Sequence, residues 1–349
     1  MTSGELLSAN TSFTRTRVDW VDGAKGLAIL LVALYHSALL LMENDMAPAW
    51  WADLGRVFAT FRMPLFFLAA GLFAGSVIAR PWRELWNSRL RLLVWMFALW
   101  TVIRFGYFAA VPLESRLGET SLRNLVLAPV LPVSGLWFVH ALFFIFIAAK
   151  LMRNRIPAPI QIGAAAILSI AFMSGVSFDS LSYNGMARYF VFFLIGCYGK
   201  QWILAATERP RWTLMVAATA LFGVLAVGVY GNSLQLIPGV AFALSLIAVS
   251  AGILMSRCLA ATPAARGLAF VGKNTLPIYV TNVIAICAVI SLIKLLPAFD
   301  GWIAGALPVV VAALSVVIGL VLWVGLRNRV KWLYEAPSFT KIKSDASTR

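Results

Sequence analysis

The sequence predicts an all-α membrane protein, a single bundle of about ten transmembrane helices with both termini in the cytoplasm. Two features of the composition support this fold class: 61% of the residues are apolar and only 12% are charged. A soluble chain carries about 25% charged residues, so a soluble globular enzyme is excluded, and so much apolar surface also excludes a disordered chain. The third feature is the grouping of the apolar residues into runs of membrane-spanning length.

Ten apolar runs qualify, or nearly qualify, as transmembrane helices, because a helix needs about 20 apolar residues to cross the hydrocarbon core. They occupy 27–42, 57–79, 92–113, 129–149, 156–178, 189–206, 212–230, 234–255, 275–298 and 302–326. The first run is short, so its helix is expected to begin before Gly26. The sixth contains Lys200 and Gln201, which leaves its inner end open. The short connectors predict one transmembrane domain, residues 17–326, between cytoplasmic tails 1–16 and 327–349.

The positions of the basic residues predict the orientation. With the N-terminus in the cytoplasm, 22 of the 29 Lys and Arg residues fall in cytoplasmic tails and connectors, and 7 do not. The positive-inside rule favours this arrangement, and an even number of spans returns the C-terminus to the cytoplasm. The net charge of +15 is therefore interpreted as basic loops that face anionic lipid, and no nucleic-acid partner is expected.

Two histidines, His36 and His140, lie within apolar runs. An ionisable side chain at that depth is costly unless it faces the bundle interior or a wet cavity. His36 follows Gly26 by 10 residues, which places it about 15 Å along the helix and near the bilayer midplane. Lys25 precedes His36 by 11 residues, close to three whole turns, so both share one helix face. Asp22 and Lys25 either begin this helix and anchor it, or form a polar cluster at the inner opening of a channel to His36.

Two arginines also lie inside predicted spans. Arg62 and Arg104 fall in the outer half of the second and third spans, where they could polarise an acyl oxygen or hold an acceptor. The alternative is that they snorkel to the outer headgroups. His140 could line the same cavity, although a structural histidine is the competing interpretation. The two histidines have no acidic partner at ligand spacing, so no metal site is expected.

Six short segments carry the most specific pattern in the chain. They are Asp22-Gly-Ala-Lys25-Gly with His36 after an apolar run, Phe61-Arg-Met-Pro-Leu-Phe-Phe-Leu-Ala-Ala-Gly71, Arg89-Leu-Arg91-Leu-Leu, Leu136-Trp-Phe-Val, Tyr189-Phe-Val-Phe-Phe-Leu-Ile-Gly196 and Asn274-Thr-Leu-Pro-Ile-Tyr279. In this order, across residues 17–326, they resemble the acyltransferase 3 family of bacterial integral-membrane O-acyltransferases. The chain departs from the family pattern in four places: Lys25 replaces the commoner Arg, Ala70 replaces Ser, Arg89-x-Arg91 replaces Arg-x-x-Arg, and Asn282 stands where many members have His.

The resemblance implies transfer of an acyl group, expected to be acetyl, from cytoplasmic acyl-CoA to a hydroxyl of a glycan or glycolipid at the bacterial inner membrane. His36 would be the general base, because a neutral imidazole can accept a proton near pH 7. Acyl-CoA would be a substrate, with no permanently bound cofactor. The expected donor-side residues are Asp22, Lys25, Arg89 and Arg91, since guanidinium groups bind phosphate well; plain positive-inside topology is the alternative for the arginines. The expected cavity residues are Arg62, Arg104, His140 and Asn282.

A second class of function fits the same polar residues. A transporter or flippase would use His36, Arg62 and Arg104 to line a translocation path, without covalent chemistry. Paired half-helices broken by Gly or Pro in two symmetric halves would favour transport. The sequence has no obvious pair of this kind, so it favours the enzyme.

Overall fold

The structure, a computed structural model, describes residues 19–297 and 299–337. Within these ranges the chain is helical and contains no strand. The long helices are α1 (Asp19–Met42), α2 (Trp50–Ile78), α4 (Arg91–Ala110), α6 (Trp137–Met152), α7 (Ala158–Met173), α8 (Leu181–Ala206), α9 (Trp212–Gly231), α10 (Val240–Leu259), α12 (Thr275–Ile293) and α13 (Gly301–Leu326). Shorter elements are α3 (Trp82–Leu85), the π-helical turn η1 (Trp86–Leu90), the 3-10 segments η2 (Glu114–Thr120), η3 (Leu234–Leu236) and η4 (Lys331–Leu333), and the helices α5 (Leu122–Leu127) and α11 (Ala265–Lys273).

The long helices have the composition of membrane spans. Eight helical stretches in the described ranges are long and apolar enough to cross a membrane, one of them the continuous stretch Trp82–Ala110. The apolar helices α6 and α7 are shorter, with 16 residues each. Each of the ten predicted runs overlaps one of these ten stretches. The prediction of an all-α, multi-pass membrane protein is therefore confirmed, whereas the exact span count and the orientation of the termini stay predictions.

Several helix ends differ from the sequence prediction. Helix α6 begins at Trp137, eight residues after the predicted start, because Pro129, Pro132 and Gly135 interrupt the apolar run. Helix α8 begins at Leu181 and continues through Lys200 to Ala206, so Lys200 and Gln201 do not break it. The start of α1 at Asp19 agrees with the expectation that its helix begins before Gly26.

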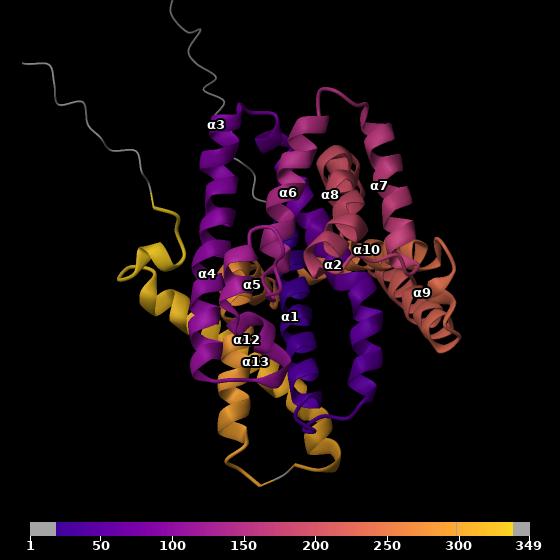
Figure 1. The fold of residues 1–349 in the computed structure, drawn as a ribbon. Helices are drawn as coiled ribbons and strands as arrows, with labels where there is room; N and C mark the ends of the chain where they lie inside the picture. The colour runs from indigo at the N-terminus through magenta and orange to yellow at the C-terminus, as the bar shows by residue number, and fades with distance from the viewer. Residues whose placement is uncertain (1–18, 298, 338–349) are drawn as a thin grey trace, which may run out of the picture.

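Alternate connectors lie at opposite ends of the bundle. Figure 1 shows α3 and the α6–α7 connector at one end, with the α1–α2 and α12–α13 connectors at the other. Two hydrogen bonds join the first pair: Lys150 Nζ donates to the carbonyl of Ile78 over 2.9 Å, and Arg153 Nη1 donates to that of Gly75 over 2.8 Å. The basic connector that follows α2 and the one that follows α6 therefore lie at the same end of the bundle, as the predicted topology requires.

The core forms where α2 and α8 cross. A Cβ on Gly71 would lie 2.1 Å from the carbonyl oxygen of Phe193, and one on Gly196 would lie 2.3 Å from that of Leu68. Only glycine allows the two backbones this approach, which is the usual role of small residues at membrane helix interfaces. Both glycines end sequence segments that resemble the family, so the structure supplies a packing reason for them.

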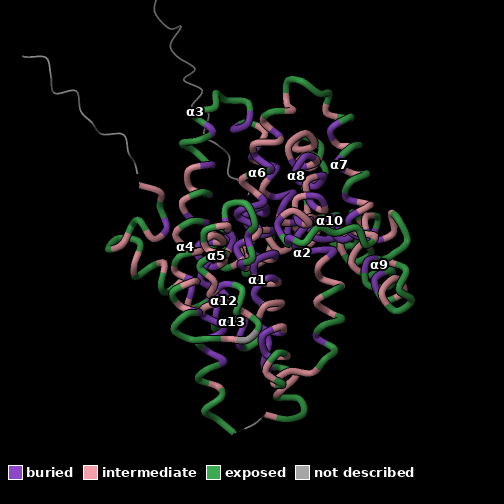
Figure 2. The backbone as a smooth tube through the Cα atoms, in the orientation of Figure 1, coloured by how far each residue is buried: buried purple, intermediate pink, exposed green. Residues whose placement is uncertain are grey.

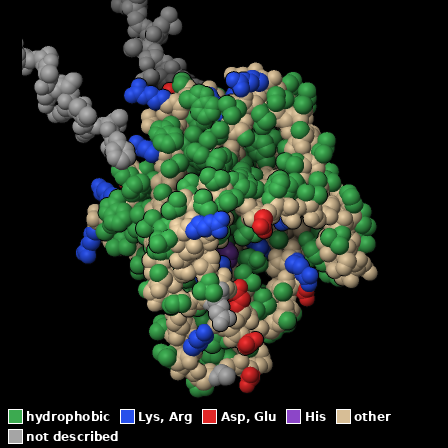
Figure 3. Space-filling view, viewed as in Figure 1, with side chains coloured by type: hydrophobic (Ala, Val, Ile, Leu, Met, Phe, Trp, Pro, Cys, Tyr) green, Lys and Arg blue, Asp and Glu red, His purple; other side chains and the backbone are tan. Residues whose placement is uncertain are grey.

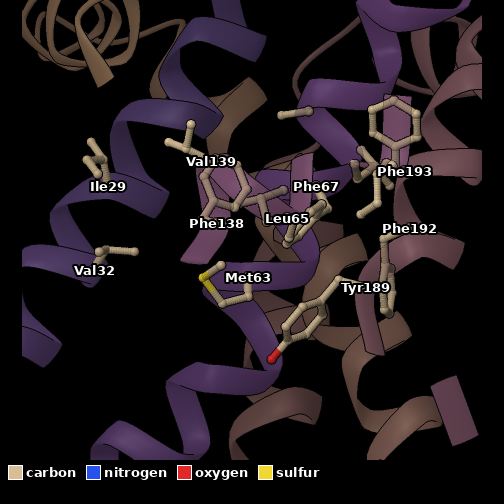
Figure 4. Close-up of a cluster of buried hydrophobic side chains, with 14 of the residues drawn as sticks. Ile29, Val32, Met63, Leu65, Phe67, Phe138, Val139, Tyr189, Phe192 and Phe193 are labelled. Atoms are coloured by element: carbon tan, nitrogen blue, oxygen red, sulfur yellow. The ribbon is translucent and has the colours of Figure 1, made fainter. Parts of the chain in front are cut away.

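The buried residues lie near these contacts between helices. Buried residues concentrate where the central helices meet, and the exposed residues lie on the outward faces and connectors (Figure 2). Many exposed side chains are large and apolar, as expected for faces that contact lipid. In the core, Phe138 of α6 lies beside Leu65 and Phe67 of α2 (Figure 4), with 4.9 Å between the ring centroids of Phe138 and Phe67. This places the start of α6 against α2.

Candidate active site

One cavity contains His36. It has a volume of about 310 Å³ and is bounded by α1, α2, η2, α6, α8 and α12. Its polar lining consists of Tyr35, His36, Arg62, Arg116, Asn184, Arg188, Tyr189 and Tyr279. We refer to it as the His36 cavity. Figure 3 shows a hollow in one face of the molecule, with a histidine side chain inside it and both basic and acidic side chains around its rim.

The imidazole of His36 has at least one ring nitrogen without a hydrogen bond to a described residue. Its Nδ1 is buried and has no hydrogen-bond partner in the described part of the chain. The ring lies beside Tyr35, with 5.2 Å between the ring centroids. The charges of Arg62, Arg116 and Arg104 all act on the imidazole. His36 thus places an imidazole nitrogen without a partner in the described part of the chain beside a cavity that three arginines line.

His140 differs from His36 in that both of its ring nitrogens have hydrogen-bond partners. Its Nδ1 lies 2.7 Å from the hydroxyl of Ser182, and its Nε2 lies 2.9 Å from the carbonyl oxygen of Pro129. Both nitrogens therefore join α6 to its surroundings, and His140 is not part of the lining of the His36 cavity. The structure favours a structural role for this histidine over the cavity position that the sequence allowed.

The side chain of Tyr35 contacts both Arg62 and His36. The Arg62 guanidinium carbon lies 4.0 Å from the centroid of the Tyr35 ring, within the range of a cation–π contact. Its Nη1 also donates to the carbonyl of Gly55 over 3.1 Å. Arg62 is only 7% exposed, so it does not snorkel to the headgroups but faces the cavity.

A second cavity contains Lys25. It measures about 250 Å³, and its lining is apolar apart from Lys25, Arg89, Thr275 and Tyr279. We refer to it as the Lys25 cavity. Lys25 Nζ lies 3.3 Å from the carboxylate of Asp22 and 5.4 Å from the centroid of Phe73. Arg89 lies in the π-helical turn η1, an irregular turn of the kind often found at functional sites.

Three side chains line both cavities: Phe66, Phe138 and Tyr279. We call them the aromatic partition. The rings of Phe66 and Phe138 meet edge to face with 4.8 Å between centroids, and those of Phe138 and Tyr279 lie 5.8 Å apart. The Tyr279 hydroxyl donates to the carbonyl of Gly135 over 2.7 Å and accepts from the backbone N–H of Phe138 over 3.2 Å. Two family-like segments, far apart in the sequence, are therefore tied together at the wall between the cavities.

The start of α6 is also fixed from the side of α8. A Cβ on Gly185 would lie 2.2 Å from the Trp137 ring, so this glycine leaves the space that the indole occupies. Trp137 and Gly185 both line the His36 cavity. The segment Leu136-Trp-Phe-Val thus supplies one wall residue of the His36 cavity and one member of the aromatic partition.

The other predicted residues lie outside both linings. Arg104 is 1% exposed and forms a two-point ion pair with Glu119, with both nitrogen–oxygen distances 2.7 Å. It lies behind the cavity wall, since a Cβ on Gly135 would be 3.5 Å from its Nη2. Asn282 is buried at the contact of α12 with α13 and accepts a 2.9 Å hydrogen bond from Ser315. Arg91 contributes to neither cavity, so of the two arginines before the third span it is Arg89 that lines one.

Sequence reasoning missed Arg116 and Arg188 as site residues. Both were counted only among the seven basic residues that depart from the positive-inside pattern. Three of those seven, Arg62, Arg116 and Arg188, line the His36 cavity, and Arg104 stands behind its wall. The departures from the topological rule were therefore the signal that could have found them.

The fold and the site define a class of protein: a multi-pass membrane protein with a polar cavity, which contains a histidine, among its helices. The family model of the acyltransferase domain matches residues 18–326, nearly the whole chain. The chain belongs to this family, the acyltransferase 3 family, and is an acyltransferase. This finding supports the enzyme interpretation over the transporter interpretation.

Two curated relatives are similar to the chain. The inner membrane protein YcfT of Escherichia coli (strain K12) is 23% identical over 285 residues, which cover 75% of this chain and 78% of YcfT. The nodulation protein NolL of Mesorhizobium japonicum is 24% identical over 205 residues, which cover 56% of this chain and 52% of NolL. The match therefore spans about half the length of NolL. No solved structure matches the chain significantly.

Proposed function

We propose that this acyltransferase transfers an acyl group, in the simplest case acetyl, from cytoplasmic acyl-CoA to a hydroxyl of a glycan or glycolipid at the bacterial inner membrane. The observation that carries the proposal is the pair of cavities that meet at the aromatic partition. One contains cationic side chains that suit a phosphorylated donor, and the other contains the histidine that suits a hydroxyl acceptor.

The Lys25 cavity would hold the donor. Lys25 and Arg89 provide positive charge for the phosphates of coenzyme A, which guanidinium groups bind through charge-assisted hydrogen bonds. Asp22 would orient Lys25 through their 3.3 Å contact. The rest of the lining is apolar and suits the pantetheine arm and the acyl group. The thioester would thus point toward the aromatic partition.

The His36 cavity would hold the acceptor. His36 takes the proton of the acceptor hydroxyl, and the oxygen attacks the thioester carbonyl. The carbon–sulfur bond then breaks, an ester forms, and the thiolate of coenzyme A leaves and takes up a proton. Arg62 would stabilise the negative oxygen that develops on the acyl group, because a fixed positive charge in a cavity shielded from water is effective there. For the atoms to meet, the acyl group has to pass Phe66, Phe138 and Tyr279.

Comparison of strains tests the proposal. Surface glycans, glycolipids and small glycosides from cells with and without the gene are compared by mass spectrometry, and a His36→Ala variant is expressed in the deleted strain. The proposal expects an ester, such as one that adds an acetyl mass, that the wild-type gene restores and the His36→Ala variant does not. Restoration of the ester by an equally expressed His36→Ala variant would remove His36 from the chemistry.

A further inference from the structure

Among the side chains that the structure describes, no carboxylate forms an ion pair with an arginine of the His36 cavity. Arg62, Arg116 and Arg188 line the cavity, and its lining includes no Asp or Glu. In the described part of the chain, ion pairs join Asp22 to Lys25, Asp53 to Arg56, Arg80 to Glu84 and Arg104 to Glu119. None of these pairs neutralises an arginine of the cavity.

The contacts of the three arginines within the protein are with neutral groups. Arg62 donates to the carbonyl of Gly55 and stacks on Tyr35. Arg188 Nε donates to the carbonyl of Phe172 over 2.9 Å. Arg116 Nε is buried and has no hydrogen-bond partner in the described ranges. Since each guanidinium carries five N–H donors, the three together retain donors for a ligand.

Arg104 shows that the fold can place a carboxylate next to a buried arginine in this part of the molecule. Arg104 lies just behind the same wall, and Glu119 binds it at two points. Three like charges around one cavity repel one another and lose hydration, a cost that is large in a partly buried site. An anion bound among them would remove this cost, and phosphate and carboxylate match the geometry of guanidinium groups.

We propose that the His36 cavity binds an anionic group of the acceptor, a phosphate or a carboxylate, next to the hydroxyl that is acylated. The inference rests on the proposed function and narrows its acceptor to an acidic glycan or a phosphate-linked glycolipid. In the proposed function the phosphates of coenzyme A bind at Lys25 and Arg89, which line the separate Lys25 cavity, so this anion is assigned to the acceptor. Lys25 and His36 are also separated by 11 residues of one helix, or about 16 Å at 1.5 Å per residue.

A binding measurement tests this without an active assay. The protein is placed in nanodiscs of neutral phosphatidylcholine, and inorganic pyrophosphate is titrated by calorimetry at fixed ionic strength, because exposed charge interactions depend on salt. A Lys25→Gln, Arg89→Gln background removes binding at the Lys25 cavity. In that background, Arg116→Gln with Arg188→Gln is expected to weaken pyrophosphate binding at least tenfold. Arg123→Gln, an exposed arginine of the neighbouring helix α5, makes the same charge change and is expected to have no effect.

Kinetics then separate the anion site from stabilisation of the transition state. Acylation is compared for a neutral glucoside, the matching glucuronide and sugar phosphate, and a phospholipid-linked sugar. The double variant is expected to raise KM at least tenfold for at least one of the charged acceptors, with kcat little changed and KM for the neutral glucoside unaffected. Arg116→Lys with Arg188→Lys should restore part of this loss. The charged acceptor that responds identifies the source of the anion as soluble or lipid-linked.

The results of the two measurements distinguish failure of the anion site from failure of the proposed acyl transfer. Unchanged pyrophosphate affinity in the double variant would overturn the inference, whatever the activity. Equal acylation of neutral and charged acceptors, dependent on His36 but not on Arg116 and Arg188, would also overturn it and leave the proposed acyl transfer standing. Loss of kcat for every acceptor alike would assign the arginines to the reacting carbonyl instead, and would likewise contradict an acceptor anion site.

Discussion

The Lys25 cavity and the His36 cavity share three aromatic side chains, and apart from these their linings differ in chemistry. The Lys25 cavity is apolar with two cationic side chains, whereas the His36 cavity contains a histidine, three arginines and several hydroxyl and amide groups. A single polar channel would carry a solute past similar groups on both sides. Two unlike cavities separated by a thin aromatic partition instead suit a reaction between two unlike substrates. The difference between them thus suits group transfer, with one substrate in each cavity as proposed.

Loss of the base is expected to have the largest effect. His36→Ala should lower acyl transfer by about 10²–10⁴-fold, the usual contribution of a general base, and should leave expression and membrane insertion unchanged. Turnover is measured on the purified, reconstituted variant with acetyl-CoA. If more than about a tenth of the wild-type turnover remains, the assignment of His36 is wrong and the His36 cavity loses its catalytic role.

The ion pair behind the His36 cavity predicts an effect on stability. Glu119→Ala leaves Arg104 buried without its carboxylate, and breaking one partner of a buried pair costs about 3–5 kcal/mol. We expect a lower midpoint of thermal unfolding in detergent and a raised KM for the acceptor, because Arg116 lies on the same short segment, η2. Glu84→Ala, which breaks the exposed pair with Arg80, is the matched control and should change the midpoint little. An equal effect of the two changes would show that Glu119 does not fix the wall.

The donor side predicts a smaller effect, confined to one substrate. Lys25→Ala or Arg89→Ala should raise KM for acyl-CoA by about tenfold, the loss of one charge-assisted interaction of roughly 1.5 kcal/mol, with little change in KM for the acceptor. Arg91→Ala serves as the control, because Arg91 lies outside the cavity lining, and Lys25→Arg should be tolerated. A fluorescence titration that gives unchanged affinity for coenzyme A in Lys25→Ala and Arg89→Ala would remove both residues from the donor site.

The smallest effect is expected at the partition itself. Phe66 is half-buried and faces both cavities, so Phe66→Ala should widen the passage between them. We expect the ratio of butyryl to acetyl transfer to rise a few-fold, which corresponds to about 1 kcal/mol, the lower end of what one methylene group contributes to pocket binding. Competition of the two acyl-CoA donors in one reaction measures the ratio directly. Phe67→Ala, a buried neighbour in neither lining, is the control, and an equal change there would mean that packing, not passage, sets the ratio.

The sequence predicted the bundle and the helix face that carries the site. Hydrophobic run length and helical periodicity were sufficient for both, because they depend on local composition alone. Lys25 and His36 line the two cavities from one helix, as their spacing indicated. Arg116 and Arg188 were not found, because their meeting depends on how η2 and α8 pack against α1, which no local pattern specifies. For the same reason the sequence did not predict that Arg104 forms an ion pair, because its partner Glu119 lies 15 residues away across a connector.

A dual-label experiment in sealed proteoliposomes tests most directly whether the acyl group alone passes the partition. Acetyl-CoA that carries one label on the acetyl group and another on coenzyme A is supplied on the side of Arg89, and the acceptor is supplied on the opposite side. The account predicts that the acetyl label appears on the acceptor, that the coenzyme A label stays on the donor side, and that His36→Ala abolishes the transfer. Movement of intact acetyl-CoA or of unmodified acceptor across the membrane, without a covalent product, would contradict it.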